Sequence, residues 1–207
     1  MSLWALPVHT VGHSTHPLGT FVSLLRQHQI AYVADIRSAP YSRFNPQFNR
    51  EPLEQGLKRS GIGYGFMGGE LGGRVEDPAC YVEGRVQYAL VAELPAFIEG
   101  LEKLQRLATN QRLALMCAEK EPLECHRTLL VAAALAKKGA RVMHILAEGG
   151  VETHEAAMER LLDVVGVPHQ DLFMTYEELV AEAVKRQAAR VAYVEEIPGR
   201  DGDRKAT

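Results

Sequence analysis

The sequence is poor in cysteine and contains no long apolar run. Its three cysteines, Cys80, Cys117 and Cys125, are spread over 207 residues, an odd and small number that does not fit a disulfide framework. No apolar stretch reaches the length of a membrane span. The start of the chain lacks the basic and apolar segments of a signal peptide. We therefore expect a cytoplasmic protein with no membrane partner.

The chain also lacks a large excess of either charge. A formal net charge of −3 argues against a protein that coats nucleic acid through bulk positive charge, although a local basic patch remains open. The apolar fraction of 46% and the charged fraction of 24% are those of a globular protein. We predict a single domain over residues 1–194 and a polar, mobile tail over residues 195–207.

Apolar residues alternate between strand-like and helix-like spacing along the chain. Dense apolar runs predict buried strands at residues 8–12, 30–36, 62–67, 112–117 and 141–146. Helical patterns lie between them, at residues 17–28, 50–60, 94–104, 125–138 and 153–165, and a capping box at Thr175 opens a last helix. This order predicts an α/β fold, a three-layer sandwich with a mostly parallel, roughly five-stranded sheet and helices on both faces.

Two segments between these elements are rich in turn-forming residues. Residues 38–49 contain Pro, Ser and Asn, and Asn49 is suited to cap the helix that follows. Residues 68–84 are so rich in glycine that we expect neither helix nor strand there. The string "GGELGG" inside this segment lacks the strand–turn–helix context of a dinucleotide-binding fingerprint, although its Glu70 remains a catalytic alternative.

Polar side chains follow several predicted strands at their carboxyl ends, where open parallel sheets bind ligands. They are His13 after the first strand, Asp35, Arg37, Ser38 and Arg43 after the second, and Cys117, Glu119, Cys125, His126 and Arg127 after the fourth. The connectors at the opposite ends of the strands lack such a concentration of candidate catalytic or binding residues. We therefore predict one site at this edge, with Arg37, Ser38, Arg43, His126 and Arg127 binding an anion.

The densest group of candidates is "CAEKEPLECHR", residues 117–127. A helix start and neighbouring His or Arg side chains lower the pKa of a thiol, so we expect Cys117 to be an activated nucleophile. The catalytic set predicted around it is His13, Asp35, Cys117 and Glu119. The alternative is a buried core cysteine, which would leave Glu119 and His13 as the catalytic pair.

Metal binding is a competing use of the same residues. Cys117, Cys125, His126 and His13 together form a Cys₂His₂ set. The spacing of the cysteines is unusual for a zinc finger, and the adjacent Cys125 and His126 are expected to point apart. We predict no metal and no cofactor, and we keep a zinc-stabilised domain as an alternative.

Four segments taken together resemble a family that is known from bacteria and archaea. They are "TVGHSTHPLGTF", "VADIRSAPYSRFNPQFN", "GGELGG" and "LALMCAEKEPLECHRTLLVAAL", followed by "HI" at residues 144–145. Their order resembles that of the family known as domain of unknown function 488. The resemblance implies a three-layer α/β fold and directs attention to the candidate residues above, but it implies no reaction.

The first functional hypothesis is an enzyme, a hydrolase or transferase that uses Cys117 or Glu119 on a small phosphorylated or nucleotide-like substrate. The second is a non-catalytic domain that binds nucleotides or single-stranded nucleic acid, because Arg43 lies among Tyr41, Phe44 and Phe48, which suit base stacking. A zinc-stabilised domain is the third. The sequence does not predict an oligomeric state.

Overall fold

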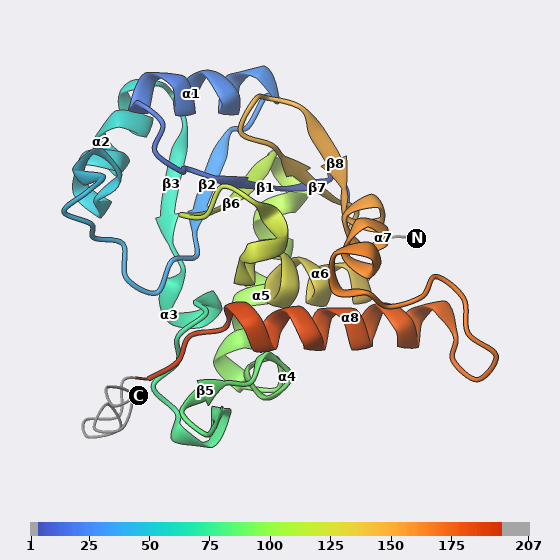
Figure 1. The fold of residues 1–207 in the computed structure, drawn as a ribbon. Helices are drawn as coiled ribbons and strands as arrows, with labels where there is room; N and C mark the ends of the chain where they lie inside the picture. Colours follow the sequence, from blue (N-terminus) through green and yellow to red (C-terminus); the bar gives the residue numbers. More distant parts are fainter. Residues whose placement is uncertain (1–3, 196–207) are drawn as a thin grey trace, which may run out of the picture.

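A six-stranded sheet runs through the centre of the protein in the computed structural model, which describes residues 4–195 (Figure 1). Its strands are β1 (Val8–Gly12), β2 (Tyr32–Asp35), β3 (Gly63–Phe66), β6 (Leu113–Cys117), β7 (Val142–Ile145) and β8 (Val151–Thr153). They lie in the order β3-β2-β6-β1-β7-β8, and all are parallel except β8, which pairs antiparallel with β7. The predicted parallel sheet is confirmed, and β8 is an addition to it.

Helices cover both faces of this sheet. They are α1 (Leu18–Gln27), α2 (Arg50–Arg59), α3 (Gly68–Leu71), α4 (Tyr88–Val91), α5 (Pro95–Asn110), α6 (Ala133–Lys137), α7 (His154–Val165) and α8 (Tyr176–Val191). A π-helical segment, η4 (Arg127–Ala132), leads into α6. Short 3₁₀ turns occur at η1 (Pro46–Phe48), η2 (Pro78–Cys80) and η3 (Pro122–Glu124). Figure 1 shows α1 and α2 on one side of the sheet and α5, α6 and α8 on the other.

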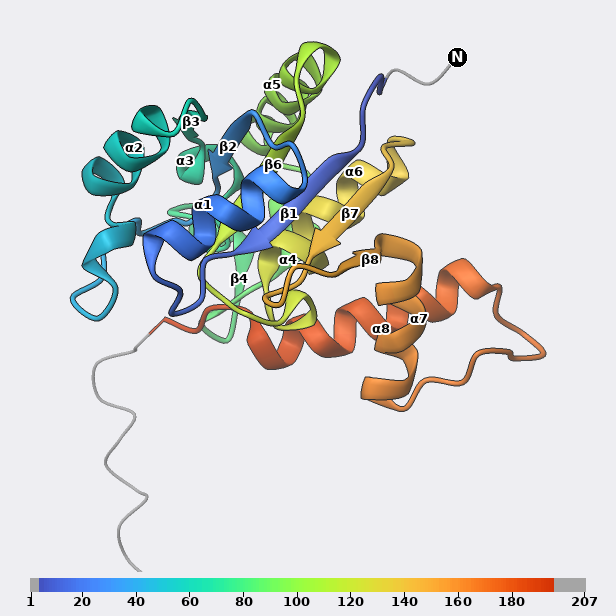
Figure 2. The ribbon, with the colours of Figure 1, turned by 90° about the horizontal axis from the view of Figure 1, so that it is seen from above.

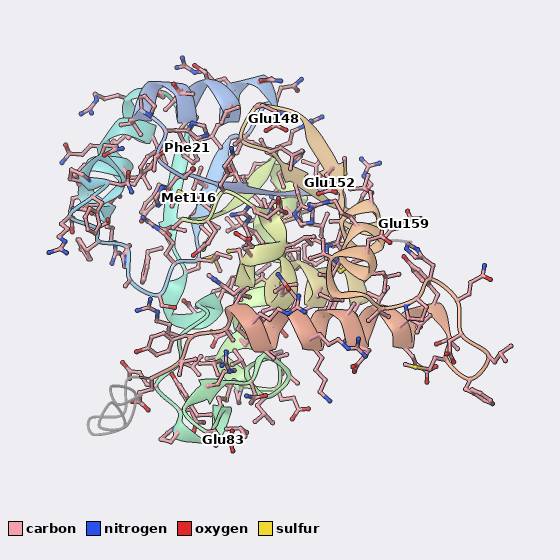
Figure 3. The ribbon with its side chains drawn as sticks, in the orientation of Figure 1. Phe21, Glu83, Met116, Glu148, Glu152 and Glu159 are labelled. Carbon is pink, nitrogen blue, oxygen red and sulfur yellow. The ribbon has the colours of Figure 1, made fainter. Side chains whose placement is uncertain are left out.

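Each face of the sheet has its own apolar core. Phe21 of α1 and Met116 of β6, both labelled in Figure 3, belong to the core under α1 and α2. Leu104 of α5 and Leu115 of β6 belong to the larger core on the other face. Full burial of such a side chain stabilises the fold by about 1.5–3 kcal/mol. The two cores confirm the predicted three-layer arrangement.

The predicted cap at Thr175 is confirmed, whereas the one at Asn49 is not. The Thr175 hydroxyl accepts a hydrogen bond from the Glu178 backbone N–H, and the Glu178 carboxylate accepts one from the Thr175 N–H. Asn49 occupies the N-cap position of α2, but its side chain accepts from the Ser42 backbone N–H at 2.7 Å. It therefore holds the preceding loop together, and the capping role predicted for its side chain is wrong.

The prediction that residues 68–84 contain no regular structure is also wrong. This segment holds the single-turn helix α3 and most of a hairpin of β4 (Tyr81–Val82) and β5 (Arg85–Val86). A two-residue hairpin turn of type I′ requires positive φ at both positions, and Glu83 and Gly84 have φ values of 50° and 76°. The buried Leu71 anchors α3 in the core, although the glycines around it disfavour a helix.

The last described residues of the chain contact this hairpin. Val194 forms an isolated bridge with Arg85, and the Glu195 N–H donates to the Gly84 carbonyl oxygen at 2.8 Å. The tail predicted from residue 195 lies, after Glu195, outside the described residues. Figure 2 shows α7 and α8 beside the β8 edge of the sheet, joined by a projecting loop. Within residues 4–195, no helix has both the length and the apolar character needed to cross a membrane.

Candidate functional site

The candidate site lies where β6 ends between β1 and β2. Gly12 of β1 is in register with Cys117 of β6, and the His13 N–H donates to the Cys117 carbonyl oxygen at 2.9 Å. After β1 and β2 the chain crosses to the α1 and α2 face, whereas after β6 it enters η4 and α6 on the opposite face. Such a divergence of loops opens a crevice at the carboxyl ends of parallel strands.

A pocket of about 370 Å³ occupies this crevice. Its lining includes Arg37, Ser38, Arg74, Tyr88, Cys117, Glu119, Glu124, Cys125, His126 and Tyr193. Of the predicted site residues, Arg37, Ser38, Cys117, Glu119 and His126 therefore meet at one pocket. His13, Asp35, Arg43 and Arg127 are not among the residues that line it.

Two cysteines and a histidine converge at the base of the pocket. The Nδ1 atom of His126 lies 3.7 Å from the Cys117 Sγ atom and 3.8 Å from the Cys125 Sγ atom. His126 Nε2 donates to the Ile36 carbonyl oxygen at 3.0 Å, which fixes the orientation of the ring. The Cys125 thiol donates to Glu119 Oε2 at 3.0 Å. We call these four side chains, of Cys117, Glu119, Cys125 and His126, the thiol cluster.

The expectation that Cys125 and His126 point apart is wrong. Cys125 is extended, with φ −138° and ψ 142°, whereas His126 is helical, with φ −59° and ψ −24°. Side chains alternate in direction only within a continuous strand. The change from extended to helical backbone therefore lets both side chains face Cys117. The π-helical turn that follows is of a kind that occurs often at functional sites.

The thiols of the cluster differ in acidity. Burial raises the pKa of Cys117 well above its usual value, and the hydrogen bond to Cys125 adds to this effect. Burial also acts to raise the pKa of Cys125, but the hydrogen bond from Cys117 and the charges of His126 and Arg127 lower it to about 6. The Arg127 backbone N–H donates to the Cys125 Sγ atom, at 3.4 Å. The hydrogen bonds and the charges of His126 and Arg127 therefore favour a thiolate on Cys125, in contrast to the activation expected for Cys117.

Arg37 is held inside the protein by a network of its own. Its Nε and Nη2 atoms donate to the two carboxylate oxygens of Asp35 at 2.9 and 2.7 Å, and Nη2 also donates to the Phe48 carbonyl oxygen. Its Nη1 atom donates to His13 Nε2 at 3.2 Å, while His13 Nδ1 donates to the Ser14 carbonyl oxygen. These contacts occupy four of the five N–H groups of the guanidinium. Arg37 thus borders the pocket with little free hydrogen-bonding capacity.

Arg127 is the largest fully buried side chain among the described residues. It donates to the carbonyl oxygens of Glu119 and Lys120 at 2.5 and 3.2 Å. These bonds hold the loop after β6 in a tight curve over β1. A Cβ atom on Gly12 would collide with the Glu119 carbonyl oxygen, so the curve requires glycine at this position of β1.

Arg74 is the pocket cation that the sequence prediction omitted. Its guanidinium is exposed and stacks on the Tyr193 ring at 4.4 Å, and its backbone N–H donates to the Ser38 hydroxyl. A Cβ atom on the preceding Gly73 would lie 2.8 Å from the His126 ring, so this glycine permits close packing of the two segments. The signal in the sequence was the position of Arg74 directly after "GGELGG". Arg43, in contrast, stacks on the exposed Phe44 outside the pocket lining.

The fold and site define a parallel α/β protein with a cysteine–histidine–glutamate cluster at the carboxyl ends of its strands. The chain matches the family described as Domain of unknown function DUF488 over residues 17–134. This match covers more than half of the chain, which therefore belongs to that family. It includes the thiol cluster and the Arg37 segment but begins after His13. No curated protein and no solved structure matches the chain.

Proposed function

We propose that the protein is an enzyme, a hydrolase or transferase, that acts on a small anionic substrate of phosphorylated or nucleotide-like chemistry. The observation that supports this function is the composition of the pocket. Its lining combines the thiol cluster with Ser38, Arg74 and Tyr193. A cavity of about 370 Å³ falls within the size range of small-molecule sites.

Arg74 and Ser38 are the groups suited to hold the anionic part of the substrate. The Arg74 guanidinium is exposed and makes a stacking contact with Tyr193, so its N–H groups are available for charge-assisted hydrogen bonds. Arg37 adds at most its one remaining N–H. Asp35 and His13 support the reaction indirectly in this proposal, because they hold Arg37 in place.

Glu119 is the proposed acid–base group of the reaction. Its carboxylate contacts Cys125 and borders the pocket, within reach of a bound substrate or water. We expect Glu119→Gln to abolish turnover while leaving substrate binding intact. The measurement is product release from a panel of phosphate monoesters and nucleotides. Equal turnover by wild type and Glu119→Gln would rule out this role.

The anion site is tested by two matched arginines. Arg74 stacks on Tyr193 at 4.4 Å inside the pocket, and Arg43 stacks on Phe44 at 4.7 Å outside it. We expect Arg74→Ala to weaken the binding of inorganic phosphate and nucleoside monophosphates about tenfold or more, since a hydrogen bond to a charged group contributes about 1.5–3 kcal/mol. Arg43→Ala serves as the control and leaves calorimetric affinities unchanged.

A second candidate function is supported by the loop that contains Arg43. Tyr41 and Phe44 are 57% and 77% exposed, and exposed aromatics beside arginine suit stacking on single-stranded bases. In this case Arg43→Ala would weaken the binding of an oligonucleotide, and Arg74→Ala would not. The same two variants therefore separate a pocket enzyme from a surface binder of nucleic acid.

A further inference from the structure

The geometry points to a mononuclear transition-metal site, with Zn²⁺ as the ion, in which Cys117, Cys125 and His126 are the protein ligands. The ligand atoms are the two Sγ atoms and His126 Nδ1, which all lie within 4.8 Å of one another. The inference deepens the proposed function because the ion would border the same pocket. Metal binding itself does not depend on which substrate is correct.

The two distances from the histidine nitrogen to the cysteine sulfurs match those of a tetrahedral zinc site. Zn–S and Zn–N bonds of about 2.3 and 2.1 Å at a tetrahedral angle place sulfur and nitrogen roughly 3.6 Å apart. The observed distances from His126 Nδ1 are 3.7 Å to Cys117 Sγ and 3.8 Å to Cys125 Sγ. An ion can therefore bind between these atoms with little movement of the chain.

His126 has the orientation of a metal ligand. Its Nε2 atom donates to the Ile36 carbonyl oxygen at 3.0 Å, so Nδ1 is the nitrogen left to bind an ion. Histidines that bind metals usually donate their second ring N–H to a carbonyl or carboxylate in this manner. The ring is also fixed from behind, because Gly73 packs against it. The backbone directly after β2 and the Gly-rich segment thus hold this ligand in place.

A buried positive charge acts on the cluster and is compatible with a bound metal. Arg127 is fully buried, its Nε atom has no hydrogen-bond partner within the described part of the chain, and its Nη atoms bond only to backbone carbonyl oxygens. A buried charge normally requires an opposite charge nearby. Two thiolates, the Glu119 carboxylate and a divalent ion have a net charge of about −1, which Arg127 neutralises. The metal-bound cluster therefore balances this buried cation, as does the metal-free cluster with both thiols protonated and Glu119 ionised.

Three protein ligands leave one position of a tetrahedral ion free. Glu119 Oε2 lies 3.0 Å from Cys125 Sγ, closer than the roughly 3.5 Å expected between two ligands of one ion. Glu119 therefore lies beside the ion and is available to accept a proton from a bound water. His13 is not a ligand, because its Nε2 atom is bonded to Arg37 Nη1. This arrangement is that of a catalytic site with an open position, in contrast to a closed structural site.

The donor atoms also select the class of ion. Two thiolates and an imidazole favour Zn²⁺ over Mg²⁺ and Ca²⁺, which prefer oxygen ligands. Binding displaces the protons that remain on the two sulfurs, and these protons pass to solvent. No change of oxidation state is involved.

The test is a metal titration of the complete, purified chain without any substrate. After removal of bound metal with a chelator, Co²⁺ is added and the thiolate-to-cobalt absorption in the near ultraviolet is followed, and Zn²⁺ is then used to displace it. We expect one equivalent to bind, with the visible bands of tetrahedral cobalt. Failure of the wild-type chain to bind near one equivalent, or binding without a thiolate band, would overturn the inference.

The three cysteines provide the matched variants. Cys80 is as buried as Cys125, at 2% exposure, but it lies at the end of η2, outside the cluster. Cys80→Ser should retain the full spectrum, whereas Cys125→Ser should lose one thiolate contribution and bind Co²⁺ at least tenfold more weakly. An unchanged Cys125→Ser spectrum would contradict the assignment. Should that variant fail to fold, the wild-type titration still decides, and it is separate from the phosphate test of Arg74.

Discussion

The two buried arginines among residues 4–195 neutralise their charge in different ways. Arg37 bonds to both carboxylate oxygens of Asp35, which itself accepts from the Tyr64 hydroxyl at 2.9 Å. Arg127 bonds only to carbonyl oxygens and to no carboxylate among the described residues. A buried charge that is paired within the fold, as Arg37 is with Asp35, stabilises the structure itself. A buried charge without such a partner, as on Arg127, implies that the balancing negative charge belongs to the neighbouring thiol cluster.

The structure changes which arginine is expected to bind the anionic substrate. The sequence presents Arg37 and Arg127 as equivalent anion-binding candidates, since each follows a strand end. In the structure Arg37 stabilises the strand end around Asp35, and Arg127 supports the loop and the charge of the thiol cluster. The accessible cation of the pocket is a third residue, Arg74. Each of these roles can be tested by replacing one residue of an interacting pair.

The largest effect is expected from removal of the carboxylate partner of Arg37. Asp35→Asn leaves the Arg37 guanidinium buried without an opposite charge, and we expect the unfolding free energy to fall by about 3–5 kcal/mol. Urea denaturation followed by circular dichroism measures this loss. A change below about 1 kcal/mol would show that Arg37 is not balanced by Asp35 and would remove the contrast with Arg127.

Acid should weaken the Arg37 network through His13. The pKa of His13 is lowered from 6.5 to about 4, chiefly by burial; the hydrogen bond to Ser14 opposes this shift and the Arg37 charge adds to it. As the pH falls, His13 therefore binds a proton at a higher pH in the unfolded chain than in the folded protein. Stability is fully present above pH 6.5 and is lost as the pH falls toward 4.

The difference between the folded and unfolded pKa values of His13 sets how much stability is lost in acid. About 2.5 pKa units correspond to at most about 3 kcal/mol at pH 4. His13→Gln keeps an acceptor for Arg37 but does not titrate, so its unfolding free energy should depend less on pH over the same window. Parallel urea titrations at pH 7 and pH 4.5 compare the two proteins. An identical pH slope for both would show that His13 does not titrate on unfolding.

Much of this arrangement was predictable from the sequence, and the exceptions have physical causes. Strand–helix alternation identified the sheet and the edge that holds the site, because apolar periodicity depends on burial. It missed β8, which has only three residues and follows two glycines. The convergence of Cys125 and His126 depends on a backbone change between adjacent residues. Sequence spacing also could not show that the Arg127 side chain turns inward, since that follows from packing against Gly12.

Removal of the Arg127 charge should weaken both metal binding and folding. Arg127→Met fills a similar volume but loses the bonds to Glu119 and Lys120 and the charge beside the thiolates. We expect stability of the metal-free protein to fall by about 1–3 kcal/mol and Co²⁺ affinity to fall about 10–100-fold, as for other groups that support metal ligands. Arg127→Lys keeps the charge and should recover part of the affinity. Equal loss of affinity in both variants would show that loop geometry, and not charge, is what Arg127 provides.

The smallest effect is expected at Glu70, the catalytic alternative suggested by "GGELGG". Its carboxylate accepts from Lys103 at 2.7 Å, and both side chains are partly exposed. Solvent and salt screen such a pair, unlike the buried Asp35–Arg37 pair. We expect Glu70→Gln to unfold at nearly the same urea concentration as wild type, and to keep both phosphate affinity and turnover, because Glu70 does not line the pocket. A large loss of stability would show that burial is a poor guide to the strength of ion pairs in this fold. A loss of turnover alone would instead move the acid–base role from Glu119 to Glu70.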